Sequence, residues 1–320
     1  MTEFKSLIAP HLDEYVKFQG SSGGYSGHAE SSLRSFDRYC ELHSDGVFFL
    51  TQRIVDGWCS KRDTESNNSC RARVYPVYDF IKYLQMRKLA DVICPLLPKR
   101  ERCTYIPHAF TEDELKRFFD ACDHLPYTKR RPSYNRKMTM PVVFRLLYST
   151  GMRPYEARML QRDDVDIQHG IISIKKTKND IQHYIVLHDS MTEILKNYNL
   201  AISRLYPKRE YFFPGVNKPY HGKIWLTYNF RQIWDSINDS HAIAYDLRHF
   251  YGTFNINRWV DQGFDFFDRF VYLSKSMGHS TLESTKYYYS LVPALSEILD
   301  KKTEKSLEWI LPEVRNEKSE

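Results

Sequence analysis

Residues 163–187 read DDVDIQHGIISIKKTKNDIQHYIVL, and this stretch decides the fold class. Its apolar residues fall into three short runs that are separated by polar turns. The runs are ValAspIle at 165–167, IleIleSerIle at 171–174 and HisTyrIleValLeu at 183–187. Short runs rich in β-branched residues and bounded by turn residues are typical of antiparallel strands. The stretch therefore predicts a small antiparallel β-sheet.

Helical patterns surround this sheet. Thr111 and Glu114 have the spacing of a capping box and precede an apolar stripe. Residues 126–137 (PYTKRRPSYNRK) are predicted to form a basic loop, followed by a helix over 138–150 that ends at Gly151. Further helices are predicted near residues 190–206, 226–237, 246–260, 265–276, 282–290 and 293–308.

The N-terminal part of the chain is predicted to be helical throughout. Four stretches have helical spacing of apolar residues, and a Gly- and Ser-rich break at 19–28 separates the first two. They lie near residues 7–18, 33–40, 51–61 and 70–88. A Pro-containing, basic segment then predicts a linker at 99–107 between domains at 1–98 and 108–320. The predicted fold class is mainly α with a small antiparallel β-sheet.

Composition narrows the functional classes. Hydrophobic residues make up 42% of the 320 residues and charged residues 27%, which is typical of a packed globular protein. No apolar stretch is long enough for a membrane helix, no signal peptide is recognised at the N-terminus, and the six cysteines form no CxxC pair. We therefore expect a soluble, cytoplasmic protein without metal or cofactor. The net charge of +6 permits DNA binding but does not establish it.

Four short motifs in the predicted second domain contain residues that suit phosphate chemistry. Arg153 follows Gly151 in SerThrGlyMetArgProTyrGlu at 149–156, and Lys178 lies in a predicted hairpin turn. Arg248 belongs to TyrAspLeuArgHis at 245–249, and His279 belongs to MetGlyHis, nine residues before Tyr288. Each motif alone is usually structural: a surface arginine, a solvated lysine, a helix cap, a packing tyrosine. Only their joint order and spacing are specific.

This order resembles that of the tyrosine recombinase (phage integrase) family over roughly residues 107–292. The resemblance implies a DNA-breaking and rejoining enzyme with an N-terminal core-binding domain at 1–98. It assigns catalytic roles to Arg153, Lys178, Tyr245, Arg248, His279 and Tyr288. ArgTrp at 258–259 and TyrLeuSer at 272–274 are similar to transposon-encoded members, and this likeness is weaker.

The residue types suit this chemistry. A tyrosine can form a covalent phosphodiester intermediate, and two arginines can bind the non-bridging oxygens of the phosphate. A lysine can protonate the departing 5′ oxygen, and a histidine can supply another donor. The resemblance further implies a 3′-phosphotyrosyl link. Among Tyr287, Tyr288 and Tyr289 the family spacing selects Tyr288, and helix geometry lets only one of the three face the phosphate.

One position departs from the family pattern, because Tyr245 stands where a histidine is usual. A phenol has a pKa of about 10 and is a poor general base at neutral pH. Two alternatives therefore stay open beside a recombinase. They are a catalytically impaired DNA-binding accessory factor and a relative resembling a type IB topoisomerase or a resolvase.

Double-stranded DNA is the expected partner, with a tetramer on synapsed DNA, a monomer in free solution, and accessory recombinase or directionality factors. The candidate phosphate contacts are Arg34, Arg38, Arg71, Arg73, Lys129, Arg130 and Arg131. The C-terminal helix near 293–308, with its stripe of Leu295, Ile298 and Leu299, is expected to dock on a neighbouring protomer. A bacterial, nucleoid-associated location follows from the resemblance.

Overall fold

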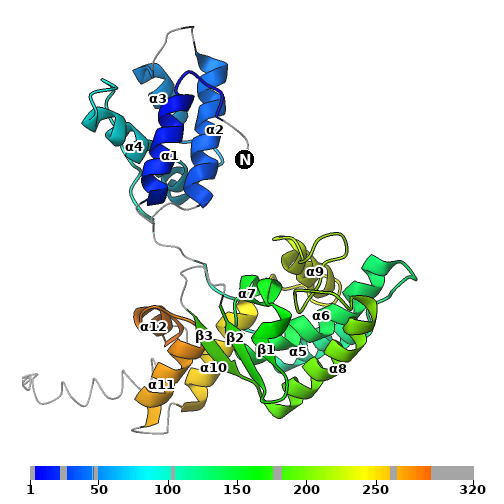
Figure 1. Ribbon diagram of the computed structural model, residues 1–320. Coiled ribbons are helices and arrows are strands. Elements are labelled where there is room, and N and C mark those ends of the chain that lie inside the picture. The colour runs from blue at the N-terminus through cyan, green and yellow to red at the C-terminus, as the bar shows by residue number, and fades with distance from the viewer. Residues whose placement is uncertain are drawn as a thin grey trace, which may run out of the picture. The chain divides into compact units, whose positions relative to one another are not determined.

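The computed structural model describes residues 4–21, 27–44, 46, 50–101, 105–175, 182–259 and 265–289, without the side chains of 265–267, 283 and 289. The chain divides into two compact units, Met1–Tyr105 and Ile106–Glu320 (Figure 1). Each unit has its own hydrophobic core.

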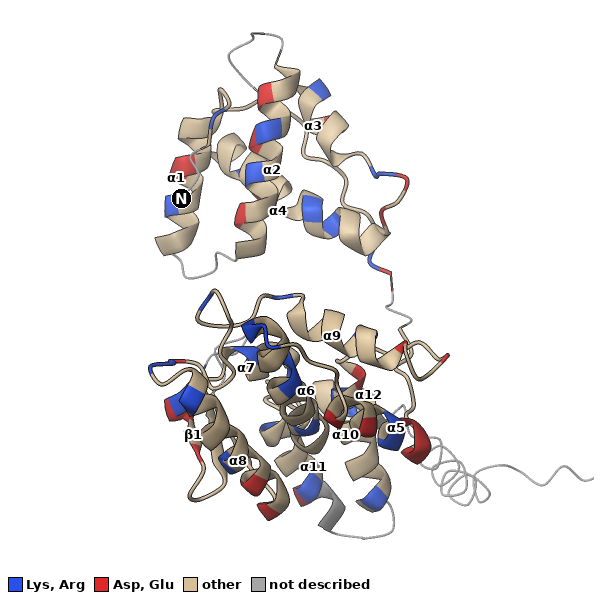
Figure 2. Ribbon diagram, turned by 90° about the vertical axis from the view of Figure 1, so that its right-hand side faces the viewer, with Lys and Arg blue, Asp and Glu red and all other residues tan. Residues whose placement is uncertain are grey.

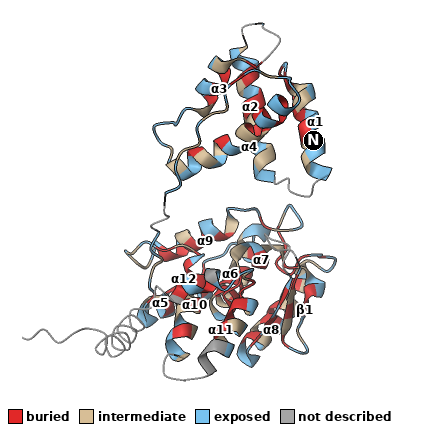
Figure 3. Cartoon of the chain, turned by 90° about the vertical axis from the view of Figure 1, so that its left-hand side faces the viewer, coloured by how far each residue is buried: buried red, intermediate tan, exposed pale blue. Residues whose placement is uncertain are grey.

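The first unit is helical. Its elements are α1 (Ala9–Ser21), α2 (Gly27–His43), α3 (Gln52–Cys59) and α4 (Asn67–Met86). All four helices contain buried residues, which are coloured red on the cartoon of Figure 3. Phe36, Phe80 and Trp58 are among them, and burial of each such side chain stabilises the unit by roughly 1.5–3 kcal/mol.

Three boundaries in this unit differ from the sequence prediction, and one of them is the start of α2 at Gly27, inside the predicted break. Helix α1 continues through Gln19 to Ser21, into the predicted break, because Ser21 Oγ donates to Lys17 O (3.0 Å) and Gln19 Nε2 donates to Tyr15 Oη (3.1 Å). Helix α4 begins before residue 70, because Ser66 caps it by accepting the Ser69 N–H at 3.1 Å.

Residues 98–101 follow α4 and are attached to it. The Asn68 side chain donates to Glu101 O (2.7 Å) and accepts the Glu101 N–H (3.1 Å). Arg71 Nη1 donates to Pro98 O at 3.1 Å. The first part of the predicted linker is therefore held on the first unit by hydrogen bonds.

The second unit begins with α5 (Glu112–Asp123), whose predicted capping box between Thr111 and Glu114 is confirmed. Figure 2 shows the acidic first turn of this helix in red. Helix α6 (Arg131–Thr150) begins before the predicted residue 138, so the predicted loop over 126–137 is wrong from Arg131 onward. Pro132 suits the first turn of a helix, and the buried Asn135 side chain donates to Pro214 O at 3.1 Å.

The predicted sheet is confirmed. After α7 (Pro154–Met159) and a short 3-10 turn at Arg162–Asp164, the strands β1 (Val165–Asp166), β2 (Ile171–Ile174) and β3 (His183–Val186) pair antiparallel in chain order. In β3 the exposure alternates, so that His183 and Ile185 are buried while Tyr184 and Val186 are exposed.

Helices complete the second unit: α8 (Asp189–Leu205), α9 (Trp225–Trp234), α10 (Asp246–Trp259), α11 (Asp265–Ser276) and α12 (Glu283–Tyr289). The helix predicted near 293–308, and with it Leu295, Ile298 and Leu299, lies outside the described residues. The described fold is mainly α with a small antiparallel sheet, as predicted.

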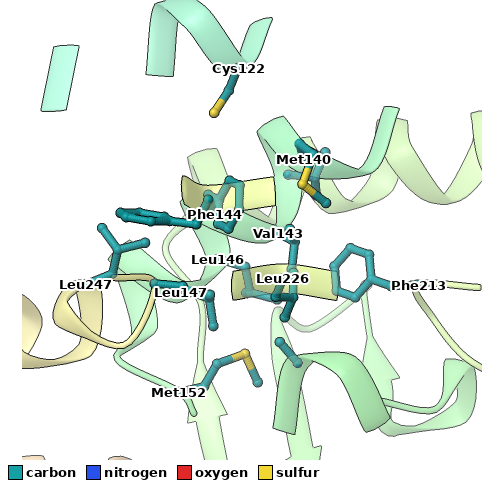
Figure 4. Packing of buried hydrophobic residues seen from close by; sticks show 14 of the residues in the cluster. Cys122, Met140, Val143, Phe144, Leu146, Leu147, Met152, Phe213, Leu226 and Leu247 are labelled. Carbon is teal, nitrogen blue, oxygen red and sulfur yellow. The ribbon is translucent and has the colours of Figure 1, made fainter. Parts of the chain in front are cut away.

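The core of the second unit lies around α6. Figure 4 shows Phe144, Leu147 and Leu247 in one cluster, which joins α6 to α10. A smaller cluster of Ile256, Phe270, Leu273, Met277 and Tyr288 joins α10, α11 and α12, which lie side by side in Figure 1. Among the described helices, none combines the length and apolar character that a membrane span needs.

Candidate active site

Arg153 is placed by the turn between α6 and α7. Gly151 ends α6 with φ +63°, a left-handed conformation that favours glycine. The buried Glu156 carboxylate accepts the Arg153 backbone N–H (2.7 Å) and Nη1 (2.6 Å), while Nη2 donates to Gly278 O at 3.0 Å. The guanidinium is therefore fixed from two sides.

Arg248 comes from α10 and is 1% exposed. Nη1 donates to Gly151 O (2.6 Å), and Nη2 donates to Met277 O (2.7 Å) and to His279 Nε2 (2.9 Å). Nε is buried and has no hydrogen-bond partner within the part of the chain that the structure describes. Because these acceptors are uncharged, they leave the positive charge of Arg248 available to an anion.

His279 lies between Arg248 and Thr285. An arginine can only donate, so Nε2 accepts, and the neutral ring carries its hydrogen on Nδ1, which donates to Thr285 Oγ1 at 2.7 Å. Burial, followed by the charges of Arg248 and Arg153, lowers the pKa of His279 to about 3. His279 is therefore neutral at physiological pH and orients Arg248 as an acceptor.

Tyr288 on α12 faces the same group of side chains and is 3% exposed. Its ring stacks on His279, with centroids 5.8 Å apart and planes 12° apart. It also packs over Gly252, where a Cβ would lie 2.8 Å from Tyr288 Cδ1. Burial raises the pKa of Tyr288, and the neighbouring Arg248 opposes that rise.

The other two tyrosines of the run differ. Tyr287 is 40% exposed, more than expected for a packing residue, although its ring contacts His249 and Tyr288 edge-on. The side chain of Tyr289 lies outside the described residues.

Tyr245 lies at the start of α10 and is exposed. Its ring contacts His249 edge-on, with centroids 5.1 Å apart. His249 packs against Tyr288 at 5.5 Å, and burial lowers the pKa of His249. Tyr245, His249 and Tyr288 therefore form one contiguous group.

Lys178 lies outside the described residues. The strands on either side of its segment are described, and β3 packs against α11. Arg153, Arg248, His279 and Tyr288 thus lie close together in the second unit. His183, Thr285 and His249 also lie among these residues, although the sequence predicts no role for them. His249 belongs to the TyrAspLeuArgHis motif, whereas His183 belongs only to a predicted strand and Thr285 to a predicted helix.

The predicted phosphate contacts of the first unit have different surroundings. Arg34 forms an ion pair with Glu30 (2.5 Å), whereas Arg38 is exposed. Arg71 holds Pro98 O, and Arg73 pairs with Glu65 (2.7 Å), whose pKa it lowers to about 2. Arg73 also donates to Ser60 O and Trp58 O. The contacts of Arg73 are those of a structural residue.

The predicted contacts of the second unit lie at the start of α6. Lys129, Arg130 and Arg131 are all exposed, and basic residues are drawn in blue in Figure 2. Arg131 Nη2 donates to Leu205 O at 2.9 Å, and its guanidinium lies 4.3 Å from the Tyr206 ring centroid. For the side chains of Lys129 and Arg130, no hydrogen bond or ion pair is found among the described residues.

Comparison with known proteins gives a consistent result. Residues 108–294 match the model of the phage integrase family. The protein y4rE of Sinorhizobium fredii is 24% identical over 90% of this chain and 93% of its own length. The tyrosine recombinase XerA of Pyrococcus furiosus is 22% identical over 89% of this chain and 90% of its own length. The crystal structure of XerH site-specific recombinase bound to difH, a pre-cleavage complex, has a similar fold, with TM-score 0.57 and 18% identity over 82% of this chain and 74% of XerH.

Proposed function

The chain belongs to the phage integrase family, and from this premise we propose that it is a site-specific DNA recombinase that cuts and rejoins DNA through Tyr288. One observation carries the proposal. Arg153 comes from the turn before α7 and Arg248 from α10, and both donate to carbonyls of the Met277–His279 turn, while the Tyr288 ring stacks on His279. Two guanidiniums beside a tyrosine hydroxyl are what a transesterification at phosphorus requires.

In the proposed reaction, Tyr288 Oη attacks phosphorus and forms a 3′-phosphotyrosyl bond while the bond from phosphorus to the 5′ oxygen breaks. Arg153 and Arg248 stabilise the charge that grows on the non-bridging oxygens. Lys178 gives a proton to the departing 5′ oxygen, as the resemblance implies. Attack by the 5′ hydroxyl of a partner strand reverses these steps and releases Tyr288.

Tyr288 must lose its hydroxyl proton when it attacks phosphorus, and burial raises the pKa of this hydroxyl. Another group must therefore accept the proton. We assign proton removal to Tyr245, whose exposed ring contacts His249, which in turn packs against Tyr288. A phenol can accept one proton while it passes its own to water, so a relay does not need the low pKa of a histidine.

Duplex DNA is the proposed substrate, bound mainly through its phosphates. Arg38, Lys129 and Arg130 are the proposed principal contacts because each is exposed, whereas the equally exposed Arg131 already donates to Leu205 O. Arg34, Arg71 and Arg131 contribute where DNA displaces their present partners, and Arg73 is assigned a structural role. Strand exchange joins two duplexes, so we propose a tetramer on synapsed DNA and a monomer in free solution.

A suicide DNA substrate, which traps the covalent intermediate, tests the proposed function. The full chain should form an adduct that survives denaturing electrophoresis. Tyr288→Phe removes one oxygen and should abolish the adduct while DNA binding persists. Tyr287→Phe is the matched control and should keep the adduct. An adduct formed by Tyr288→Phe would overturn the assignment, and no adduct with any variant would favour a catalytically impaired accessory factor.

A further inference from the structure

His183 is a buried histidine beside the proposed site that the reaction above does not use. It is the first residue of β3 and pairs with Ile174 of β2, so the register of the sheet fixes its backbone. The alternation along β3 directs its side chain inward, where it is 8% exposed, whereas the next residue, Tyr184, is 71% exposed.

The His183 ring lies against the backbone of Gly278. A Cβ built on Gly278 would lie 2.5 Å from His183 Cε1 and 2.7 Å from Nδ1, closer than any side chain tolerates. Gly278 also has φ +64°, which favours glycine independently. The ring and the turn therefore fit together only because residue 278 has no side chain.

The turn that His183 contacts holds both arginines. Gly278 O accepts Arg153 Nη2 at 3.0 Å, and Met277 O accepts Arg248 Nη2 at 2.7 Å. His279 Nε2 accepts the same Arg248 nitrogen at 2.9 Å. A shift of this turn would therefore move both guanidiniums.

We propose that His183 is a positioning residue: its ring braces Gly278 and so sets the positions of Arg153 and Arg248 on the scissile phosphate. The proposal rests on the proposed function above, because it assigns the two arginines to phosphate binding. It adds a role for the sheet, which supports the turn through one side chain.

The test compares two suicide substrates with the full chain. One has the ordinary scissile phosphate, and the other has a methylphosphonate, in which a methyl group replaces one charged oxygen. His183→Ala should slow cleavage of the ordinary substrate by roughly ten- to a hundredfold, the range for a misplacement of about 1 Å. The loss should be much smaller on the methylphosphonate, which carries less charge for the arginines to stabilise. DNA affinity should be unchanged.

Two variants serve as controls. His183→Phe keeps a ring against Gly278 and should cleave both substrates nearly as the natural protein does. Tyr184→Ala alters the exposed neighbour and should change neither rate. If His183→Ala does not fold, Gly278→Ala pushes the turn from the other side and should show the same charge-dependent loss.

Arg248→Ala, assayed in parallel, separates the two proposals. If Arg248→Ala slows cleavage of both substrates equally, the proposed function of the arginines is wrong. Suppose instead that Arg248→Ala shows the charge-dependent loss of cleavage rate. The positioning role of His183 is then overturned if His183→Ala cleaves both substrates normally, or if it slows cleavage of both equally. A His183→Phe variant that folds yet is as slow as His183→Ala would also overturn it.

Discussion

At the scale of single residues, the site depends on groups that accept hydrogen bonds from arginines. His279 was expected to donate to the phosphate, yet its Nε2 accepts from Arg248 and its Nδ1 donates to Thr285. Arg248 can only donate, so it selects the tautomer with the hydrogen on Nδ1, and the completely buried Thr285 hydroxyl accepts that hydrogen. The rotamer of Arg248 therefore depends indirectly on a hydroxyl that does not touch the proposed phosphate position.

Thr285→Val should test this dependence, because valine has nearly the same shape but lacks the hydroxyl. The variant leaves His279 Nδ1–H buried without its acceptor, which should cost about 1–3 kcal/mol in the free energy of unfolding. Covalent adduct formation should slow, while DNA affinity should stay the same. Ser284→Ala, at the exposed neighbouring position, is the control. Unchanged adduct formation in Thr285→Val would show that the hydrogen bond from His279 to Thr285 does not help to position Arg248.

The sequence could predict the residues that residue type and spacing identify. Arg153, Arg248, His279 and Tyr288 lie together as the motif order implied. It could not predict Met277 O or Gly278 O as acceptors, because every residue has a carbonyl. Thr285 and His183 belong to none of the four motifs. Only the folded structure shows that Thr285 contacts His279 and that His183 lies against Gly278.

At the scale of elements, α10 and α12 approach each other at a glycine. Gly252 is one turn after Arg248 on α10, and the Tyr288 ring of α12 lies over it. Helix boundaries were the least predictable features, because caps and side-chain hydrogen bonds decide them. The start of α6 at Arg131 is an example: the polar, Pro-containing stretch predicts a loop, whereas Pro132 lies in the first turn of the helix.

Gly252→Ala should therefore separate helix stability from site geometry. Alanine normally stabilises a helix interior by roughly 0.5–1 kcal/mol relative to glycine, but here its Cβ would lie 2.8 Å from Tyr288 Cδ1. Displacement of Tyr288 should slow adduct formation. Gly20→Ala in α1 has nothing within 4 Å of its Cβ and should leave adduct formation unchanged. Equal rates for both variants would mean that the α10–α12 contact does not set the position of the nucleophile.

At the scale of the whole molecule, the chain carries a net charge of only +6, so its affinity for DNA must come from local groups of basic residues. Many arginines already have intramolecular partners, as Arg73 has with Glu65 and Arg145 has with Asp123. The sequence lists basic residues without showing which of them are paired. Exposure and pairing in the structure select Arg38, Lys129 and Arg130 from the seven candidates.

The salt dependence of DNA binding tests this selection. Each true phosphate contact should lower the slope of log affinity against log salt concentration by about 1 when it is replaced. We expect that decrease for Lys129→Ala and for Arg130→Ala, measured by titration of a labelled duplex at several salt concentrations. Arg145→Ala is the control, because Arg145 lies on α6, which Lys129 and Arg130 directly precede, and donates to both oxygens of Asp123 at 2.8 and 2.7 Å. Its slope should not change, since an arginine already neutralised by a carboxylate releases no counterion from DNA. A slope lowered equally in all three variants would mean that exposure does not identify the phosphate contacts, and unchanged slopes at 129 and 130 would place the DNA on another face of the second unit.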